Sequence, residues 1–278
     1  MVQTTQIKPA EILQPFIHCY AMRAFDTGES AMPMPMHAMN ECYMTFFLKD
    51  KFTTVVSETG TQKRMSSTLV SLFTNSQGVA LYKGNYCLLS IQFRSNGFFA
   101  IFGIPQRLLL NSFVPLEDIL GEKVYSNLSD KLQSCDSIVE MGNHLNSYFT
   151  QKLLLLKHKS HTQVIAYIAA SVSKNKGLAS VDDLAYEANM SVRNFERRFI
   201  DEVGMSPKLY SRITRFFLAV EKKMLCPEKN WTTITYESGY FDQAHFIREC
   251  KEFSSRTPEE LFQFTPPPTE EFIEKVDF

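Results

Sequence analysis

The C-terminal half of this 278-residue chain holds an internal repeat at an offset of 51 residues, and this repeat limits the fold more than any other feature does. The paired residues are Ser191 and Asp242, Phe195 and Phe246, Arg197 and Arg248, and Phe199 and Cys250. Gly204-x-Ser206-Pro207 then corresponds to Ser255-x-Thr257-Pro258. Upstream, residues 184–190 parallel residues 234–240, with one extra residue in the second turn. The repeat predicts two copies of one supersecondary unit.

Each copy has the pattern of a short helix, a tight turn and a longer helix. Ser191 and Asp242 each offer a side-chain oxygen that can cap the N-terminus of the longer helix. In both longer helices, apolar residues three and four apart form one face: Val192, Phe195 and Phe199 in the first, and Phe246, Cys250 and Phe253 in the second. Two such helices, each preceded in the sequence by a shorter helix and a tight turn, are typical of two helix-turn-helix units.

The opposite faces of the longer helices are mostly polar. They carry Arg193, Glu196 and Arg197 in the first copy, and Gln243, Ala244, Ile247, Arg248 and Lys251 in the second. Residues 207–224 between the copies predict one long helix, which also carries Arg212 and Arg215. At 1.5 Å per residue this helix is about 27 Å long. It could hold the two longer helices roughly one DNA turn apart, about 34 Å.

Charge alone does not distinguish this half of the chain as a DNA-binding domain. Residues 160–264 contain 14 basic and 14 acidic residues, so the usual basic footprint is missing. Residues 191–223 hold eight basic and four acidic residues, a local excess of +4. A solvated face is the simpler interpretation of one charged helix. Here, however, an arginine recurs at the equivalent outward position of both copies.

The N-terminal half has the short period of β-structure. Cys87, Leu89, Ile91 and Phe93 alternate with their neighbours, which predicts a strand with one buried face. Short segments of similar composition recur before it, separated by turn-forming residues. Residues 1–120 therefore predict an antiparallel β-barrel or jelly roll rather than alternating strands and helices.

A helical period follows the strands. The spacing of apolar residues over 122–157 predicts two amphipathic helices. These helices form a connector, which either caps the barrel or forms a dimer seam. We expect a polar linker at residues 157–161 and a flexible, acidic, proline-rich tail at 265–278. The chain is thus expected to be an α+β protein with one domain at 1–157 and an all-α domain at 162–264.

Other sequence features favour a cytoplasmic protein. The longest apolar runs are far shorter than the ~20 residues of a membrane helix, so no membrane partner is expected. The N-terminus lacks the basic and apolar regions of a secretory signal. The six cysteines include no Cys-x-x-Cys pair, which disfavours a disulfide framework or a structural zinc site.

Several motifs in the repeat have family-specific spacing. They are Asp183-Leu184-Ala185, Ser191-x3-Phe195-x3-Phe199, Gly204-x-Ser206-Pro207, Gly239-Tyr240-x-Asp242-x3-Phe246, Arg248-x2-Lys251 and Thr257-Pro258. Together they resemble the DNA-binding domain of AraC/XylS-type transcription regulators, from about residue 163 to 264. Thr235, Cys250 and Ser255 replace the alanine, phenylalanine and glycine usual in that family. We expect these departures to weaken the second unit.

The resemblance implies sequence-specific binding of double-stranded DNA. It assigns major-groove base contacts to Arg193, Glu196 and Arg197 in the first unit, and to Gln243, Ala244, Ile247 and Arg248 in the second. Arginine suits guanine because its two donors can bond O6 and N7 together. Arg212, Arg215 and Lys251 are expected at phosphates or in solvent.

The N-terminal half resembles the cupin-like sensor regions of the same family, through residues 93–98 and 116–121. This resemblance implies effector binding or dimerisation there. The expected partners beyond DNA are then a second copy of the chain, a small-molecule effector and RNA polymerase. The effector-binding residues are unknown from the sequence.

Two alternatives keep the barrel as the functional part. The first is a sensor for an apolar or aromatic molecule, with a pocket outlined by strand residues such as Tyr43, Phe46, Leu72 and Tyr82. The second is a metal-dependent cupin-like enzyme with an accessory helical domain. Such a metal site needs several converging imidazoles, and the barrel region has only two histidines. Because no catalytic motif is found either, we expect no metal, no cofactor and no enzyme activity.

Overall fold

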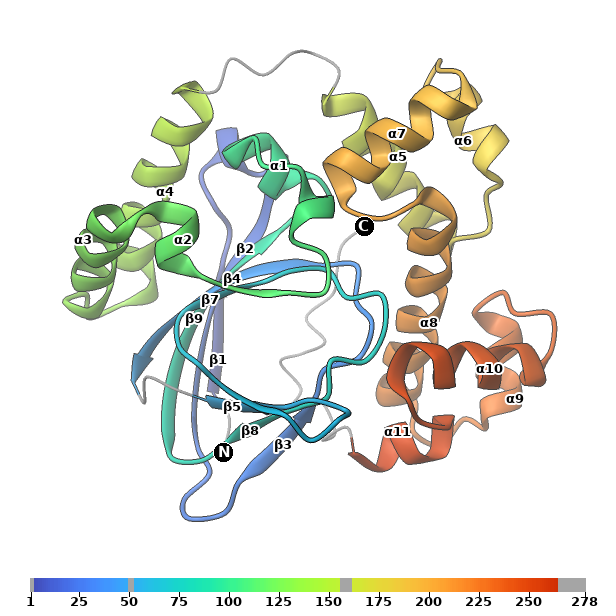
Figure 1. The fold of residues 1–278 in the computed structure, drawn as a ribbon, viewed down its shortest axis with the longest axis horizontal. Coiled ribbons are helices and arrows are strands. Elements are labelled where there is room, and N and C mark those ends of the chain that lie inside the picture. Colours follow the sequence, from blue (N-terminus) through green and yellow to red (C-terminus); the bar gives the residue numbers. More distant parts are fainter. Residues whose placement is uncertain (1–2, 50–52, 156–161, 265–278) are drawn as a thin grey trace.

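The computed structural model describes residues 3–49, 53–155 and 162–264. An N-terminal domain of strands and helices lies beside a C-terminal domain built of helices (Figure 1). This is the expected α+β two-domain architecture. The predicted polar linker and the tail at 265–278 lie outside the described residues. None of the described helices combines the length and the apolar composition needed to cross a membrane.

The N-terminal strands form two antiparallel sheets. The larger has the order β1-β2-β9-β4-β7-β10, and the smaller has the order β3-β8-β5-β6. The bounds of the larger sheet are β1 Gln3–Ile7, β2 Ile17–Asp26, β9 Asn85–Phe93, β4 Cys42–Lys49, β7 Thr68–Val70 and β10 Phe113–Pro115. Those of the smaller are β3 Met32–Pro35, β8 Val79–Tyr82, β5 Thr53–Val56 and β6 Gln62–Met65. Among the described strands the sheets stay open, so the two-sheet form of the prediction is observed and a closed barrel is not.

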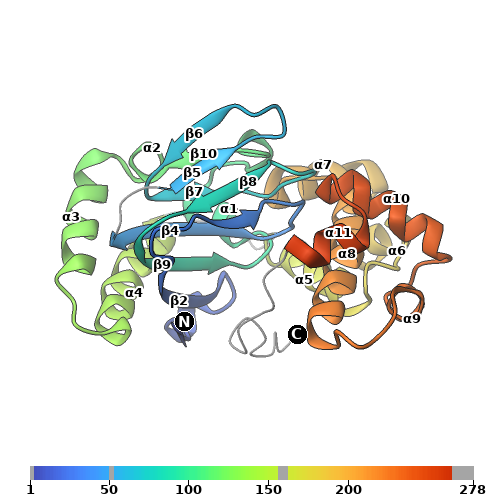
Figure 2. The ribbon, with the colours of Figure 1, turned by 90° about the horizontal axis from the view of Figure 1, so that it is seen from below.

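The central strand β9 is buried on the face that its alternation predicts and, at its start, on the opposite face as well. Leu89 and Ile91 are fully buried in the main core. On the opposite face, Tyr86 and Leu88 are also buried, in a second cluster that contains Phe25. The reason is that Met32 of β3 and Tyr82 of β8, in the small sheet, pack against this cluster at the start of β9, whereas Ser90 and Gln92 further along are half-buried. In Figure 2, strands β5, β6 and β8 of the small sheet lie above β9 and β2 of the large sheet.

Helices cover the remaining face of the large sheet. The predicted connector is two helices, α3 Glu122–Gln133 and α4 Ile138–Leu155. Shorter elements precede them: the 3-10 turns η1 Glu11–Leu13 and η2 Gln106–Leu108, and the helices α1 Gly97–Phe102 and α2 Leu116–Leu120. Phe149 of α4 is fully buried, with its ring edge-on to Phe93 at 6.0 Å between centroids. These helices therefore close the core of the N-terminal domain.

Helices are the only regular elements in the described part of the C-terminal domain. They are α5 Thr162–Lys174, α6 Val181–Glu187, α7 Val192–Val203, α8 Pro207–Leu225, α9 Trp231–Glu237, α10 Gln243–Ser254 and α11 Pro258–Phe264. The predicted caps form. The Ser180 side chain accepts from the Asp183 N–H at the start of α6. Ser206, the residue before the proline that begins α8, accepts from the Leu209 N–H. Helix α8 connects the two predicted units, and it is one residue longer than expected.

The N-terminal domain contacts both units of the C-terminal domain. At the end of α7, the buried side-chain amide of Gln106 donates to the Glu202 carbonyl at 2.6 Å, and Arg107 pairs with Asp201 at 2.6 Å. At the other unit, the Ala38 N–H donates to the carbonyl of Phe253, near the end of α10, at 2.8 Å. The two helix-turn-helix units are thus joined through α8 and also through the other domain.

Candidate nucleic-acid interface

Helix α7 has the buried and exposed faces that the repeat predicts. Phe195 and Phe199 are fully buried, and Ser191 caps the helix by accepting from the Asn194 N–H. Val192, expected on the buried face, is 37% exposed, because the first residue of the helix lies beyond the core that the two phenylalanines fill. The helix is therefore fixed from behind, and its opposite face is open.

The open face of α7 carries the predicted polar residues. Arg193 and Arg197 are exposed, and Glu196 between them is half-buried. The Arg197 guanidinium donates to the Asn194 side-chain oxygen at 2.9 Å, on the same helix. Both arginines are consequently free to reach a ligand at this face.

Helix α10 repeats the arrangement with a different outer surface. Asp242 caps it by accepting from the His245 N–H at 2.6 Å, while Phe246 and Cys250 are fully buried. The predicted outward residues divide into three exposed ones, Ala244, Arg248 and Lys251, and two half-buried ones, Gln243 and Ile247. Gln243 accepts from the Thr232 hydroxyl at 3.2 Å, so its side chain is also tied to α9.

The two helices lie on one side of the domain. Figures 1 and 2 show α7 and α10 on the same side of α8, towards the viewer in Figure 1, with α5 and α9 behind. Neither Arg197 nor Arg248 is buried.

Arg212 and Arg215 are turned towards α10. Arg212 pairs with Glu249 at 2.8 Å and with Glu252 at 2.5 Å, and its guanidinium carbon lies 5.0 Å from the centre of the Phe253 ring. Arg215 lies 3.9 Å from Glu249, which is buried. The sequence had no signal for these pairs, because the partners are about 35 to 40 residues apart. Contact with phosphates stays a prediction for both arginines.

Comparison with known families settles the class of this domain. Residues 184–263 match a family model described as a helix-turn-helix domain. This region is an AraC-type helix-turn-helix domain. An AraC-type domain of this kind is the DNA-binding part of a transcription regulator, so DNA binding and transcription regulation are the functional class of the chain. No curated protein sequence is similar enough to count as a relative.

Solved structures with a similar course of the chain include ToxT from Vibrio cholerae O395. That structure has a TM-score of 0.48 and 12% identity, over 88% of this chain and 97% of that one. ToxT bound to (E)-4-(8-methylnaphthalen-1-yl)but-3-enoic acid has a TM-score of 0.46 and 14% identity, over 95% and 99%. Wild-type ToxT from Vibrio cholerae strain SCE256 with an unsaturated fatty acid bound has a TM-score of 0.44 and 12% identity, over 95% of each chain.

The second unit of the AraC-type domain departs from the family pattern at three positions, and the structure gives each a physical reading. Thr235 is fully buried, and its hydroxyl has no hydrogen-bond partner. Cys250 is fully buried in the core, at a position where the family usually has the larger phenylalanine. Ser255 ends α10 with a φ of 61°, the left-handed conformation that favours glycine. Thr235 and Cys250 lie where the sequence predicts weaker packing, and Ser255 lies where it predicts a weaker helix cap.

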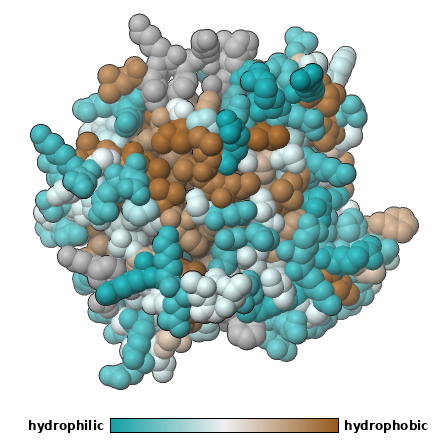
Figure 3. All heavy atoms as spheres, in the orientation of Figure 1, coloured by the Kyte–Doolittle hydropathy of each residue, from teal (hydrophilic) through white to brown (hydrophobic). Residues whose placement is uncertain are grey.

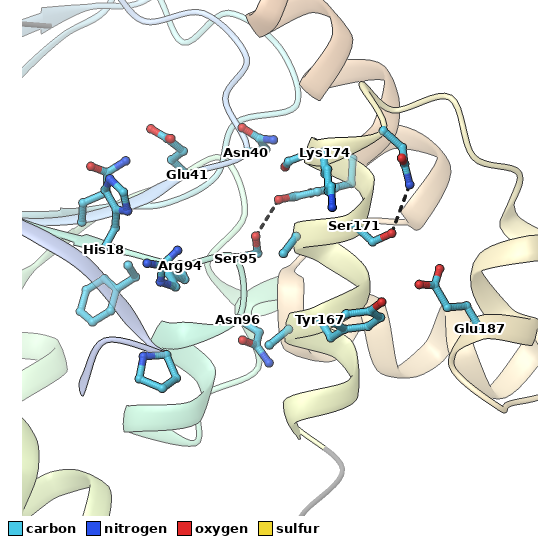
Figure 4. A pocket seen from close by; sticks show the side chains of 18 residues that line it. His18, Asn40, Glu41, Arg94, Ser95, Asn96, Tyr167, Ser171, Lys174 and Glu187 are labelled. Atoms are coloured by element: carbon cyan, nitrogen blue, oxygen red, sulfur yellow. Dashed lines mark hydrogen bonds between the residues drawn. The ribbon is translucent and has the colours of Figure 1, made fainter. Parts of the chain in front are cut away.

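A cavity of about 590 Å³ lies where the AraC-type domain meets the N-terminal domain. Figure 4 shows Glu41, Arg94 and His18 on one side and Lys174 and Tyr167 of α5 on the other. The sequence predicted that a pocket, if present, lies among the strands, but Phe46 and Leu72 of that outline are packed in the core. The cavity between the domains could not be predicted, because two domains contribute to it and no local pattern links residues so far apart.

Burial alters the charge of the cavity. It raises the pKa of Glu41 to about 7, with Glu221 of α8 adding repulsion. Burial also lowers the pKa of His18, and nearby Arg94 lowers it further. Arg94 and Lys174 therefore supply the positive charge. No cluster of three or more metal-ligating side chains occurs in the described parts of the chain.

Proposed function

We propose that α7 and α10 read two successive major grooves on one face of DNA. The observation that carries this proposal is the exposure of Arg197 and Arg248 at equivalent positions of two helices on the same side of α8. Helix α8 has 19 residues, about 28 Å at 1.5 Å per residue. One DNA turn is about 34 Å, so the spacing is compatible with adjacent grooves.

Each exposed side chain has a role that its chemistry suits. Arg193 and Arg197 would bond the O6 and N7 acceptors of guanine, and Glu196 would accept from a cytosine amino group. In the second unit Gln243 and Arg248 would make the polar base contacts. Lys251, one turn further along α10, would contact a phosphate. Phosphate contacts fix position, whereas base contacts specify sequence.

Selection of bound oligonucleotides from a random pool tests the proposal. The full chain should enrich a site with two recognition elements about one turn apart. Arg197→Ala should lower the preference for the selected site over random DNA by about 10- to 100-fold, because a bidentate guanine contact contributes about 1–3 kcal/mol of discrimination. Arg64→Ala, an exposed arginine on β6, serves as the matched control and should leave the preference unchanged. Equal losses on selected and random DNA for Arg197→Ala would contradict the role.

The N-terminal domain is proposed to modulate DNA binding through the cavity between the domains. A small molecule that bridges Arg94 and Lys174 would touch both domains at once. Its binding would therefore alter how the domains are held together. A thermal-shift survey with small organic acids should raise the melting temperature of the wild type and not of Lys174→Ala. No response to any acid would favour dimerisation as the task of the domain.

A homodimer is the proposed assembly. Support comes from the connector helices, where Val139 is 58% exposed and Leu154 67% exposed. Figure 3 shows a second apolar area on the front face, over η2 and the segment after it, where Leu108 is 63% exposed. Sedimentation equilibrium tests the assembly: a monomer at all concentrations would exclude it. Contact with RNA polymerase stays a prediction.

A further inference from the structure

The two recognition helices differ in chemistry at corresponding positions. At the offset of the repeat, Arg193 of α7 corresponds to Ala244 of α10, and Glu196 corresponds to Ile247. Only the arginine that follows, Arg248 in the second unit, is kept. At these two positions the first unit offers charged groups and the second offers apolar ones, whereas Gln243 is the polar counterpart of Val192.

Phe241 enlarges this apolar surface. It is the extra residue that the second turn contains, and its side chain is 86% exposed. It directly precedes Asp242, the cap of α10, so it lies at the end of the recognition helix that enters the groove. Phe241 lies in the turn before the cap, and Ala244 and Ile247 are on the first two turns of α10, so all three are near the N-terminal end of the helix. We call these three residues the apolar edge.

Charge around the apolar edge fits nucleic acid. Arg248 and Lys251 are exposed on the adjoining turns of the same helix. Phosphates attract these cations, and apolar groups between them can then contact the bases. In the major groove, the apolar feature that a base pair presents is the C5-methyl group of thymine.

We propose that the apolar edge reads thymine methyl groups, so that van der Waals contacts add to the polar base contacts of Gln243 and Arg248 in the second half-site. This inference rests on the proposed function and deepens it. Phe241 is its central residue, because it has the largest exposed apolar side chain at the edge. The second half-site should therefore contain thymines at fixed positions.

Replacement of thymine by deoxyuridine tests the inference, since uracil pairs as thymine does but lacks the methyl group. The half-site of α10 is identified as the positions where Arg248→Ala relaxes selection. In that half-site, at least one thymine-to-uracil change should weaken binding of the full chain about fourfold, the value for one buried methyl group. The same change in the half-site of α7 should have less than a twofold effect.

Two variants connect the effect to the edge. Phe241→Ala should bind the thymine site more weakly than the wild type does, and it should no longer distinguish uracil from thymine at the sensitive position. Tyr186→Ala is the matched control, because Tyr186 is 88% exposed but lies on α6 of the first unit. It should keep the wild-type uracil sensitivity. Both variants should melt as the wild type does, because the side chains are exposed.

Three outcomes would overturn the inference. Uracil could be tolerated at every position, the sensitivity could persist in Phe241→Ala, or Phe241→Ala could bind all sites as the wild type does. The last result would assign the exposed ring to a protein partner. Failure of the proposed function is a different result, since the wild type would then enrich no DNA site at all.

Discussion

Thr235 illustrates how one side chain can weaken a unit without changing its fold. Its buried hydroxyl has no hydrogen-bond partner, and such a group costs about 1–3 kcal/mol. Thr235→Ala should therefore raise the free energy of unfolding of the C-terminal domain by about 1 kcal/mol, measured by urea denaturation. Thr214→Ala is the contrasting variant, because the Thr214 hydroxyl donates to the Tyr210 carbonyl at 2.8 Å and accepts from Asn40. Thr214→Ala should lower the free energy of unfolding. A loss of stability in both variants would contradict this account.

Glu41 gives a pH dependence whose sign follows from its burial. Its pKa is raised from 4.5 to about 7, so the folded state holds the proton more tightly than the unfolded state does. Stability therefore falls as the pH rises between these two values. Glu41→Gln should match the wild type near pH 4.5 and exceed it by about 1–2 kcal/mol at pH 8, in melting experiments across the range. A difference that does not vary with pH would refute the assignment.

At the scale of whole elements, the ion pairs between α8 and α10 set the position of the second recognition helix. Arg212→Ala would leave Glu249, buried and 2.8 Å away, without its main partner. We expect a lower melting temperature, because the buried carboxylate would lose its ion-pair partner. The dependence of DNA affinity on salt reports separately whether Arg212 also contacts a phosphate. Glu249→Gln should reproduce the loss of stability. A salt slope lower by about 1 in Arg212→Ala would show a phosphate contact.

The helices of the repeat could be predicted from the sequence almost residue by residue. Ser191 and Asp242 carry local capping signals, and the spacing of Phe195 and Phe199 defines a face without knowledge of the partner. The strands were predicted less well. Alternation in β9 indicated one buried face, but the burial of Tyr86 depends on a second sheet that no local pattern reveals.

The same limit applies to the candidate site. Exposed residues such as Arg197 and Arg248 were found because the repeat marks them. The ion pairs of Arg212 and the cavity beside Glu41 were missed, because both need the tertiary arrangement of distant segments. Capping residues and apolar spacing identify α7 and α10 from the sequence alone. The contacts that position these helices leave no such local signal.

At the scale of the molecule, the N-terminal domain is bonded to the ends of both recognition helices, through Gln106 at α7 and Ala38 at α10. One added base pair between the half-sites rotates the second by about 34–36° and shifts it by about 3.4 Å. The full chain should bind such an expanded site at least tenfold more weakly, in gel-shift titrations. The variant Gln106→Ala, which loses one of these bonds, should tolerate the insertion better; equal penalties would argue against the role of the contact. A DNA-binding protein held in this way would measure length along the duplex as well as base identity, and a molecule that loosened the junction would widen the set of DNA sites it accepts.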